Sequence, residues 1–209
     1  MTRLVIIGAG GHGKVVADCA KTIDRHRQIV FLDNAYPEHS GFCGWEVVGH
    51  PDDYLNFQQG SEYFVAIGNN QVRRQWQDTL QQNNCDIATL VHPSSQVGTD
   101  VSIGKGTLVL ASSVINILTR IGEGCIVNTS ASVDHDCVLG DFVHIAPGVR
   151  LAGTVTLHAG VFMGVASAVI PGVVIGKNTV VGAGATVVSD IPEAVTVVGT
   201  PAKVIKHNV

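Results

Sequence analysis

A chain of 209 residues with a formal net charge of −4 and only 14% charged residues has no basic footprint for nucleic acid or an anionic membrane. Its first apolar run covers only four residues before glycines follow, so we expect neither a signal peptide nor a membrane span. Five cysteines without CxxC spacing indicate reduced thiols in a cytoplasmic protein, and neither a disulfide framework nor a zinc site.

The first part of the chain alternates between two patterns. Apolar runs typical of buried strands occupy residues 4–8, 29–33, 63–68 and 87–91. Apolar residues at helical spacing fill segments 14–26 and 70–83. Segment 35–60, with several glycines and prolines, is predicted to be mostly loop. Strands separated by helices favour a parallel sheet, so we expect a Rossmann-like α/β domain over residues 1–90.

The front domain begins with a glycine motif. Residues 8–13, GAGGHG, satisfy G-x-G-x-x-G between a predicted strand and a predicted helix, and Asp33 follows twenty positions later. Such glycines let backbone N–H groups approach a pyrophosphate at a helix N-terminus. The domain is too short for the two halves that hold a dinucleotide, so a nucleoside diphosphate fits better. Alternatively, the glycines serve packing alone and His12 is a solvated loop residue.

From Val97 the period changes to six. Sixteen successive sixth positions, from Val97 to Val187, are all aliphatic, and Val91 fits the same frame. This pattern predicts a solenoid of short flat strands that stack an aliphatic ladder inward. No insertion breaks the frame, so we expect no extruded loop. Residues 91–209 therefore form a second, all-β domain with a C-terminal extension.

The repeat and both ends of the chain carry a family resemblance. The hexads resemble the left-handed parallel β-helix of hexapeptide-repeat acyltransferases, in which three hexads make one triangular coil. The ending VVGTPAKVIK (197–206) resembles that family's closing motif. With MTRLVIIGAGGHGKVV at the front, the whole chain resembles bacterial nucleotide-amino-sugar N-acetyltransferases and sialic acid O-acetyltransferases. The resemblance implies a homotrimer that uses acetyl-CoA at active sites between subunits.

Two histidines stand inside the repeat, in ASVDHDCVLGDFVHIA (131–146). A histidine suits removal of the proton that acetyl transfer to an amine releases. By the resemblance, His135 is the catalytic base, Asp136 is the acidic residue that orients it, and His144 contacts the acetyl-CoA thioester region. Asp134 could share the orienting role, and the residues leave this open. Alternatively, both histidines are ordinary surface residues.

The spacing of these histidines has a consequence for assembly. Equivalent places recur every eighteen residues in a three-hexad coil, so the nine residues between His135 and His144 put them half a coil apart. One subunit carries them on different sides of its triangle. They converge only where one subunit's face meets another's.

The resemblance also assigns binding residues. Those for the nucleotide-sugar are Gly10, Gly11 and His12 at the phosphates, Asp33 and Asn34 near the base or ribose, Gly68 after the third strand, and Asn128 facing the sugar. Those for acetyl-CoA are His144, Gly153, Val165 and Ala183. Val165 and Ala183 lie eighteen residues apart, so they stack one coil above the other, as a long pantetheine arm needs. Alternatively, the last three are ordinary turn positions. No resident metal is expected.

The expected reaction is N-acetylation of a UDP- or dTDP-linked 4-amino-4,6-dideoxy sugar for lipopolysaccharide or O-antigen synthesis. His135 acts as general base in a ternary complex, without an acyl-enzyme. Three alternatives remain: O-acetylation of sialic acid, a zinc-dependent β-helix hydratase with ligands His135, His144 and His158, and a non-catalytic nucleotide-binding scaffold. The residues decide neither between UDP and dTDP nor the sugar's configuration, and the C4 amine follows from the resemblance alone.

Overall fold

The computed structural model describes residues 3–24 and 28–208. The chain divides into two compact units, Met1–His92 and Pro93–Val209, close to the boundary expected after residue 90. Within the described residues, no helix combines the length and hydropathy that crossing a bilayer requires.

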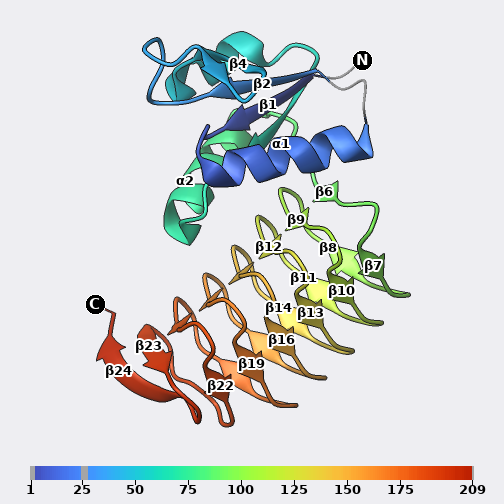
Figure 1. Ribbon diagram of the computed structural model, residues 1–209, viewed down its shortest axis with the longest axis vertical. Coiled ribbons are helices and arrows are strands. Elements are labelled where there is room, and N and C mark those ends of the chain that lie inside the picture. Colours follow the sequence, from blue (N-terminus) through green and yellow to red (C-terminus); the bar gives the residue numbers. More distant parts are fainter. Residues whose placement is uncertain (1–2, 25–27, 209) are drawn as a thin grey trace. The chain divides into compact units, whose positions relative to one another are not determined.

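The front unit is built on a five-stranded sheet with the order β3-β4-β2-β1-β5 (Figure 1). Its strands are β1 (Arg3–Ile7), β2 (Ile29–Leu32), β3 (Gly41–Phe42), β4 (Trp45–Gly49) and β5 (Ser61–Val65). All neighbours pair in parallel except β3 with β4, which are antiparallel. Its helices are α1 (Gly11–Ile23), the 3₁₀ helix η1 (Pro51–Phe57) and α2 (Asn70–Gln82). The predicted Rossmann-like α/β fold is thus present.

The prediction of a loop over residues 35–60 was wrong for much of that segment. β3 and β4 form a tight hairpin whose turn uses Cys43 and Gly44, both with positive φ. Edge-on contact between the Phe31 and Phe42 rings, whose centroids are 5.1 Å apart, holds the hairpin against β2. Pro51 is the first residue of η1. Proline suits this position because its missing backbone N–H would have no partner within the helix there.

Two other boundaries differ from the prediction. The expected fourth strand, 87–91, forms only one bridge to the front sheet, between Tyr63 and Ile87. Its last two residues form β6 (Leu90–Val91), the end strand of another sheet. The first helix begins at Gly11 and ends at Ile23, whereas residues 14–26 were predicted. Residues 25 and 26 of that prediction lie outside the described residues.

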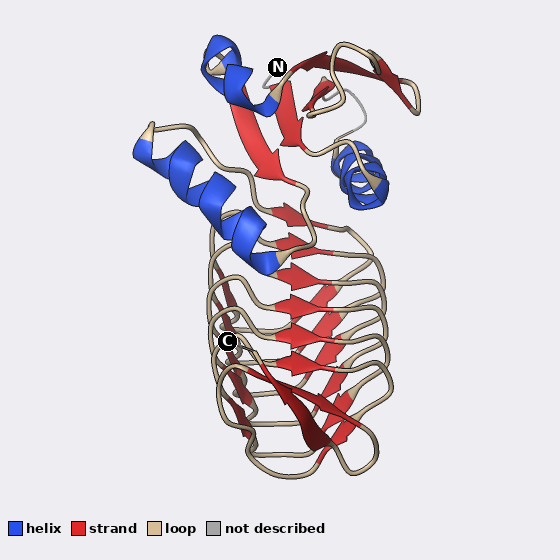
Figure 2. Ribbon diagram, turned by 90° about the vertical axis from the view of Figure 1, so that its left-hand side faces the viewer, coloured by secondary structure: helices blue, strands red, loops and turns tan. Residues whose placement is uncertain are grey.

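The second unit is a left-handed parallel β-helix whose short strands form three sheets (Figure 2). The first sheet contains β7 (Gln96–Val97), β10 (Val114–Ile115), β13 (Ser132–Val133), β16 (Arg150–Leu151), β19 (Ala168–Val169) and β22 (Thr186–Val187). The second sheet contains β8 (Ser102–Ile103), β11 (Arg120–Ile121), β14 (Val138–Leu139), β17 (Thr156–Leu157) and β20 (Val174–Ile175).

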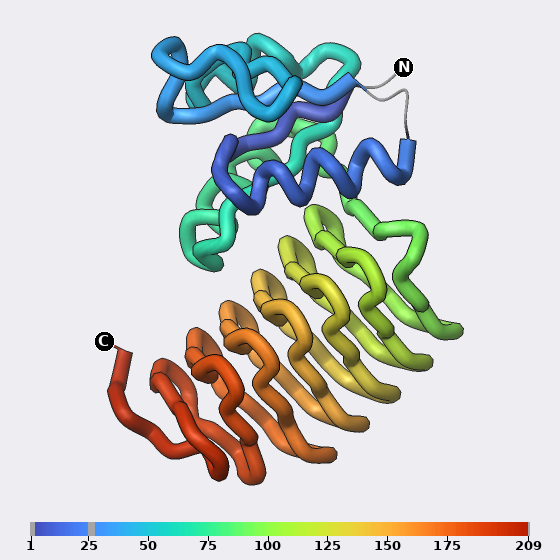
Figure 3. The backbone as a smooth tube through the Cα atoms, in the orientation of Figure 1, coloured from blue at the N-terminus to red at the C-terminus, as the bar shows by residue number. Residues whose placement is uncertain are grey.

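The third sheet begins with β6 and also contains β9 (Leu108–Val109), β12 (Ile126–Val127), β15 (His144–Ile145), β18 (Phe162–Met163), β21 (Val180–Val181), β23 (Val195–Val198) and β24 (Lys203–His207). Only β24 runs antiparallel to its neighbour. The backbone passes through successive coils from residue 97 to residue 187 without an extruded loop (Figure 3).

The six-residue period is confirmed at every strand from β7 to β22, because each predicted aliphatic residue is the second residue of its strand. These side chains form the core: Val127, Val133 and Ile145 are fully buried, whereas Val97 on the terminal coil is exposed. Strand pairing joins residues eighteen positions apart, as Val114 with Ser132. The neighbours of any coil residue on the adjacent coils are therefore the residues eighteen positions before and after it.

Removing part of this ladder should destabilise the fold. Leu157 is fully buried on β17, between Leu139 and Ile175 of the neighbouring strands. We expect Leu157→Ala to lower the free energy of unfolding by about 2–5 kcal/mol, through lost burial and the cavity left behind. Thr156→Ala, on the outward face of the same strand, should stay within about 0.5 kcal/mol. Urea unfolding at one protein concentration measures both variants, and equal losses would contradict the inward ladder.

Candidate functional site

His135 lies on an exposed turn of the β-helix, between β13 of the first sheet and β14 of the second. We call this column of stacked turns the His135 corner; in this coil it is residues 134–137. Asp136 takes the left-handed conformation that the turn requires, with φ 56°. Its Oδ2 lies 2.8 Å from Nδ1 of His135, and the His135 side chain is 52% exposed. With Nδ1–H donating to Asp136, Nε2 carries the lone pair that can accept a proton.

The two aspartates beside His135 have different partners. Asp136 contacts the imidazole, whereas Asp134 Oδ1 accepts hydrogen bonds from Asn116 Nδ2 at 2.7 Å and from the His135 backbone N–H at 2.9 Å. Asp134 O also accepts from Thr119 Oγ1 at 2.8 Å. The geometry therefore gives Asp136 the ring contact and Asp134 the backbone contact.

These contacts shift the pKa values of His135 and Asp134. The hydrogen bond that His135 donates to Asp136, helped by the charges of Asp134 and Asp136, holds the pKa of His135 above its ordinary value of 6.5, although desolvation opposes the rise. The hydrogen bond from Asn116, followed by that from the His135 N–H, lowers the pKa of Asp134. At neutral pH, Asp134 is a carboxylate and His135 is a stronger base than a free imidazole.

A cavity of about 430 Å³ opens beside the same turn. It is lined by Asp100, Leu118, Arg120, Asp136 and Val138. Asp136 thus contacts the imidazole and also faces a space that a small polar molecule can enter.

The other β-helix candidates lie away from His135, except Gly153, which occupies the same corner one coil further on. Val165 and Ala183 stack on the turns that join the third sheet to the first, where Gly184 N donates to Val165 O at 2.8 Å. Asn128 begins a turn of this same column, which we call the Val165 corner.

His144 lies on the third sheet, on β15, and is only 9% exposed. Its ring meets the Phe162 ring edge-on, with centroids 5.1 Å apart, and Ile126 is its partner on the other neighbouring strand. His135 and His144 are thus on different sides of the coil, as their nine-residue spacing predicts.

The three histidines of the hydratase alternative do not come together. His135 is at its corner, His144 is on the third sheet, and His158 lies in the turn after β17. Nowhere in the described ranges do three His, Cys, Asp or Glu side chains gather to hold a metal ion.

In the front unit, the glycine loop connects β1 to α1 as predicted. Side chains added at Gly10 and Gly11 would meet no heavy atom within 4 Å, so the backbone there is open to a ligand. Gly13 differs, because a Cβ on it would lie 2.3 Å from the carbonyl oxygen of Gly8. The loop therefore uses its glycines both for open access at the helix N-terminus and for close packing.

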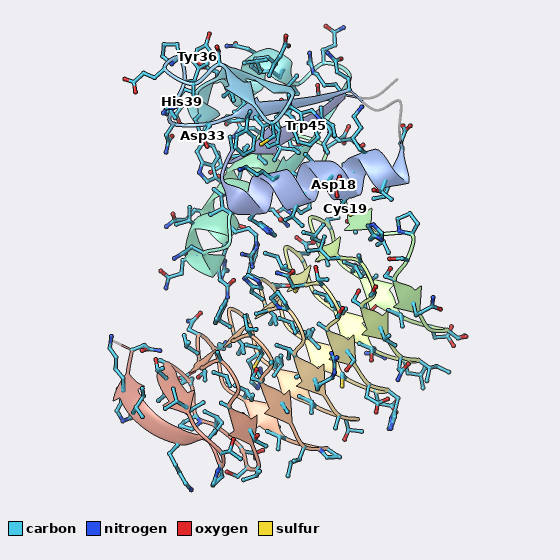
Figure 4. All side chains as sticks on the ribbon, in the orientation of Figure 1. Asp18, Cys19, Asp33, Tyr36, His39 and Trp45 are labelled. Carbon is cyan, nitrogen blue, oxygen red and sulfur yellow. The ribbon has the colours of Figure 1, made fainter. Side chains whose placement is uncertain are left out.

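Asp33 holds this loop through its carboxylate. Oδ2 accepts a hydrogen bond from the backbone N–H of Ala9 at 2.6 Å, and Oδ1 accepts from Ala35 N–H at 2.9 Å. Asp33 and the exposed Tyr36 come from the segment that follows β2, in which Asn34 is also exposed (Figure 4). The carboxylate therefore connects the end of β2 to the glycine loop, and Asn34 is the neighbour that faces solvent.

His12 lies in the first turn of α1 and is half-buried. Burial, and then the positive charge of Arg73, lower the pKa of His12 to about 4. It is therefore neutral near pH 7 and can offer a phosphate a hydrogen bond but no charge. Gly68, after β5, has open space where a Cβ would lie.

Sequence reasoning missed two residues. Arg73 is 1% exposed and donates to the carbonyls of Ile67 and Gly68 and to Asn70 Oδ1, which fixes the loop before α2. Its polar surroundings in the sequence give no signal of burial. Asn116 could have been found, because it precedes Asp134 by the eighteen residues of one coil.

Comparison with known proteins covers both units. The PglD N-terminal domain family matches residues 3–80, and the bacterial transferase hexapeptide family (six repeats) matches residues 118–153. A GDP-perosamine N-acetyltransferase of Escherichia coli O157:H7 is 28% identical over 97% of this chain and 96% of its own length.

Solved structures agree with these matches. The acetyltransferase domain of PglB from Neisseria gonorrhoeae FA1090, in complex with acetyl coenzyme A, has a TM-score of 0.93 at 36% identity, over 97% of this chain and 98% of its own. A histidine-to-asparagine mutant of perosamine N-acetyltransferase from Caulobacter crescentus, in complex with CoA and GDP-perosamine, has a TM-score of 0.93 at 37% identity, over 99% and 98%.

The contact between Asp136 and His135 predicts a pKa change. In Asp136→Asn, loss of the carboxylate should lower the pKa of His135 toward its ordinary value, because the protonated ring loses its anionic partner. Asp141→Asn, in another turn of the same coil, should leave that pKa unchanged. Titration of the imidazole resonances by NMR, with the His135 signals assigned through His135→Gln, measures both. An unchanged pKa in Asp136→Asn would mean that the contact is not formed in solution.

The hydrogen bonds of Asp33 predict that one substitution will lower both the stability of the protein and its affinity for a nucleoside diphosphate. Asp33→Ala leaves two backbone N–H groups without their carboxylate acceptor, which should cost about 1–3 kcal/mol of stability. Nucleoside diphosphate affinity should fall with it, because the loop is no longer held. Asp18→Ala, at an exposed position of α1, is the matched control. Thermal unfolding and calorimetry with UDP and GDP give the two readouts, and full affinity in Asp33→Ala would contradict this role.

Proposed function

The chain belongs to the bacterial nucleotide-amino-sugar N-acetyltransferases with hexapeptide repeats, and we propose that it acetylates the amino group of a nucleotide-linked 4-amino-4,6-dideoxy sugar with acetyl-CoA as donor. The geometry of His135 is the main support for this reaction. His135 has one ring nitrogen bonded to Asp136, and its side chain is half exposed, so the other nitrogen is available to a substrate. This is the arrangement of a general base.

The proposed step is direct transfer in a ternary complex. Nε2 of His135 takes one proton from the neutral sugar amine as the amine nitrogen bonds to the thioester carbonyl carbon. The C–S bond then breaks, and the proton passes to the departing CoA thiolate. Asp136 stabilises the transient imidazolium. Acid–base catalysis of this kind contributes about 10²- to 10⁴-fold, and alignment of the two substrates supplies the rest.

The proposed binding roles follow the two units. Open backbone at Gly10 and Gly11, in the loop that Asp33 holds, supports a diphosphate site, with His12 as a neutral hydrogen-bonding group. The Val165 corner offers stacked backbone at Val165 and Ala183 for the pantetheine arm. His144 at the thioester and Asn128 at the sugar remain proposals from the family pattern.

The proposed assembly is a homotrimer. His135 and His144 lie on different sides of one coil, so they can share a site only if two subunits meet. The surface around His135 suits such a contact, because Ile117, Leu118 and Val138 are each 44–49% exposed.

The nucleotide is the least constrained part of the proposal. The sequence led us to expect UDP or dTDP, and this stays a prediction. One similar protein is named a GDP-perosamine N-acetyltransferase, and another is a perosamine N-acetyltransferase solved with GDP-perosamine, so GDP-linked sugars must be tested beside UDP- and dTDP-linked sugars.

The decisive test is release of CoA thiol with a panel of acceptors. The panel holds UDP-, dTDP- and GDP-linked 4-amino-4,6-dideoxy sugars, free sialic acid and CMP-sialic acid. We expect turnover on one nucleotide-amino sugar and a loss of about 10²- to 10⁴-fold in kcat for His135→Ala. His158→Ala, another turn histidine of the β-helix, should keep wild-type activity.

The other outcomes discriminate the alternatives. Turnover only on sialic acid would keep the mechanism and replace the acceptor. Nucleotide binding without turnover would indicate a scaffold. No thiol release with any acceptor, together with bound zinc in the purified protein, would support the hydratase.

A further inference from the structure

Gly153 leaves the space that the His135 ring occupies. It follows His135 by one coil in the same column of turns, and Thr154 N donates to His135 O at 2.9 Å. A Cβ built on Gly153 would lie 2.6 Å from both Cε1 and Nε2 of His135, and 3.2 Å from Cδ2. Separations below 3 Å are essentially never seen for a real Cβ, so alanine at position 153 and the imidazole in this position exclude each other.

The backbone itself does not require glycine there. The residue with positive φ in this turn is Thr154, at 61°, and Gly153 is not among the residues with positive φ. At the same place in other coils of this column stand Ile117, His135 and Pro171, so the column accepts side chains. Glycine is thus explained by the imidazole beneath it and not by the turn.

We propose that Gly153 is a positioning residue, whose missing side chain makes the slot that holds the His135 imidazole against Asp136. The space above Gly153 accommodates the ring edge that carries Nε2, the nitrogen proposed to face the substrate. Asp136 accepts the hydrogen bond from Nδ1, the other ring nitrogen. This role rests on the proposed function of His135 as the base. It differs from the acetyl-CoA contact expected for Gly153 from the family pattern, and the two roles predict different kinetics.

The first experiment separates them. In Gly153→Ala the ring must leave its position, so kcat should fall about 10- to 100-fold while the KM for acetyl-CoA changes less than threefold. The pKa of His135, followed by NMR, should fall toward its ordinary value as contact with Asp136 is lost. Gly41→Ala, where an added Cβ meets nothing within 4 Å, is the matched control and should leave kcat and this pKa unchanged. A higher KM for acetyl-CoA at unchanged kcat would overturn the proposal.

A double-mutant cycle tests the contact without relying on activity. Gly153→Ala should lower the thermal midpoint in the wild type but not in a His135→Ala background, where the clashing ring is gone. An equal loss in both backgrounds would show that Gly153 serves the fold alone and would overturn the proposal. If His135→Ala keeps full activity, the proposed function fails, while the NMR titration and the thermal cycle still decide whether Gly153 holds the ring.

Discussion

The eighteen-residue stacking of the β-helix is the constraint on which the rest of the second unit depends. Parallel strand pairing fixes the register of every coil, so each turn residue has one set neighbour above and one below. Asn116 meets Asp134 in this way, and His135 meets Gly153. The site therefore depends on residues from three successive coils, although His135 and both aspartates lie in one short stretch of sequence.

Position within the turn then separates the roles of the two aspartates. Asp134 stands before His135 and bonds along the stack, to Asn116 in the preceding coil and to the His135 N–H. Asp136 stands after it, where positive φ turns its carboxylate onto the ring. Two residues of the same chemistry thus do different work because one fixes the backbone and the other polarises the imidazole.

Periodicity explains what the sequence could and could not predict. The strands from β7 to β22 follow directly from the hexads, because every coil repeats the same local contacts. The β3–β4 hairpin was missed because it depends on the non-local contact of Phe42 with Phe31. The sequence could not decide which of Asp134 and Asp136 orients His135. The two aspartates flank the histidine on either side, and only the backbone angles of the turn determine which carboxylate reaches the ring.

The front unit shows what the structure adds to the glycine motif. An acidic residue twenty positions after the glycine loop is expected near the base or ribose, and both oxygens of Asp33 also accept backbone N–H groups. Likewise, burial and Arg73 hold the pKa of His12 near 4, whereas Asp136 raises that of the exposed His135. Since proton transfer near pH 7 requires a group that changes charge near that pH, His135 can serve as a base. His12 cannot, so any contribution it makes at a phosphate is that of a neutral hydrogen-bond donor, and backbone N–H groups at the start of α1 must supply the attraction.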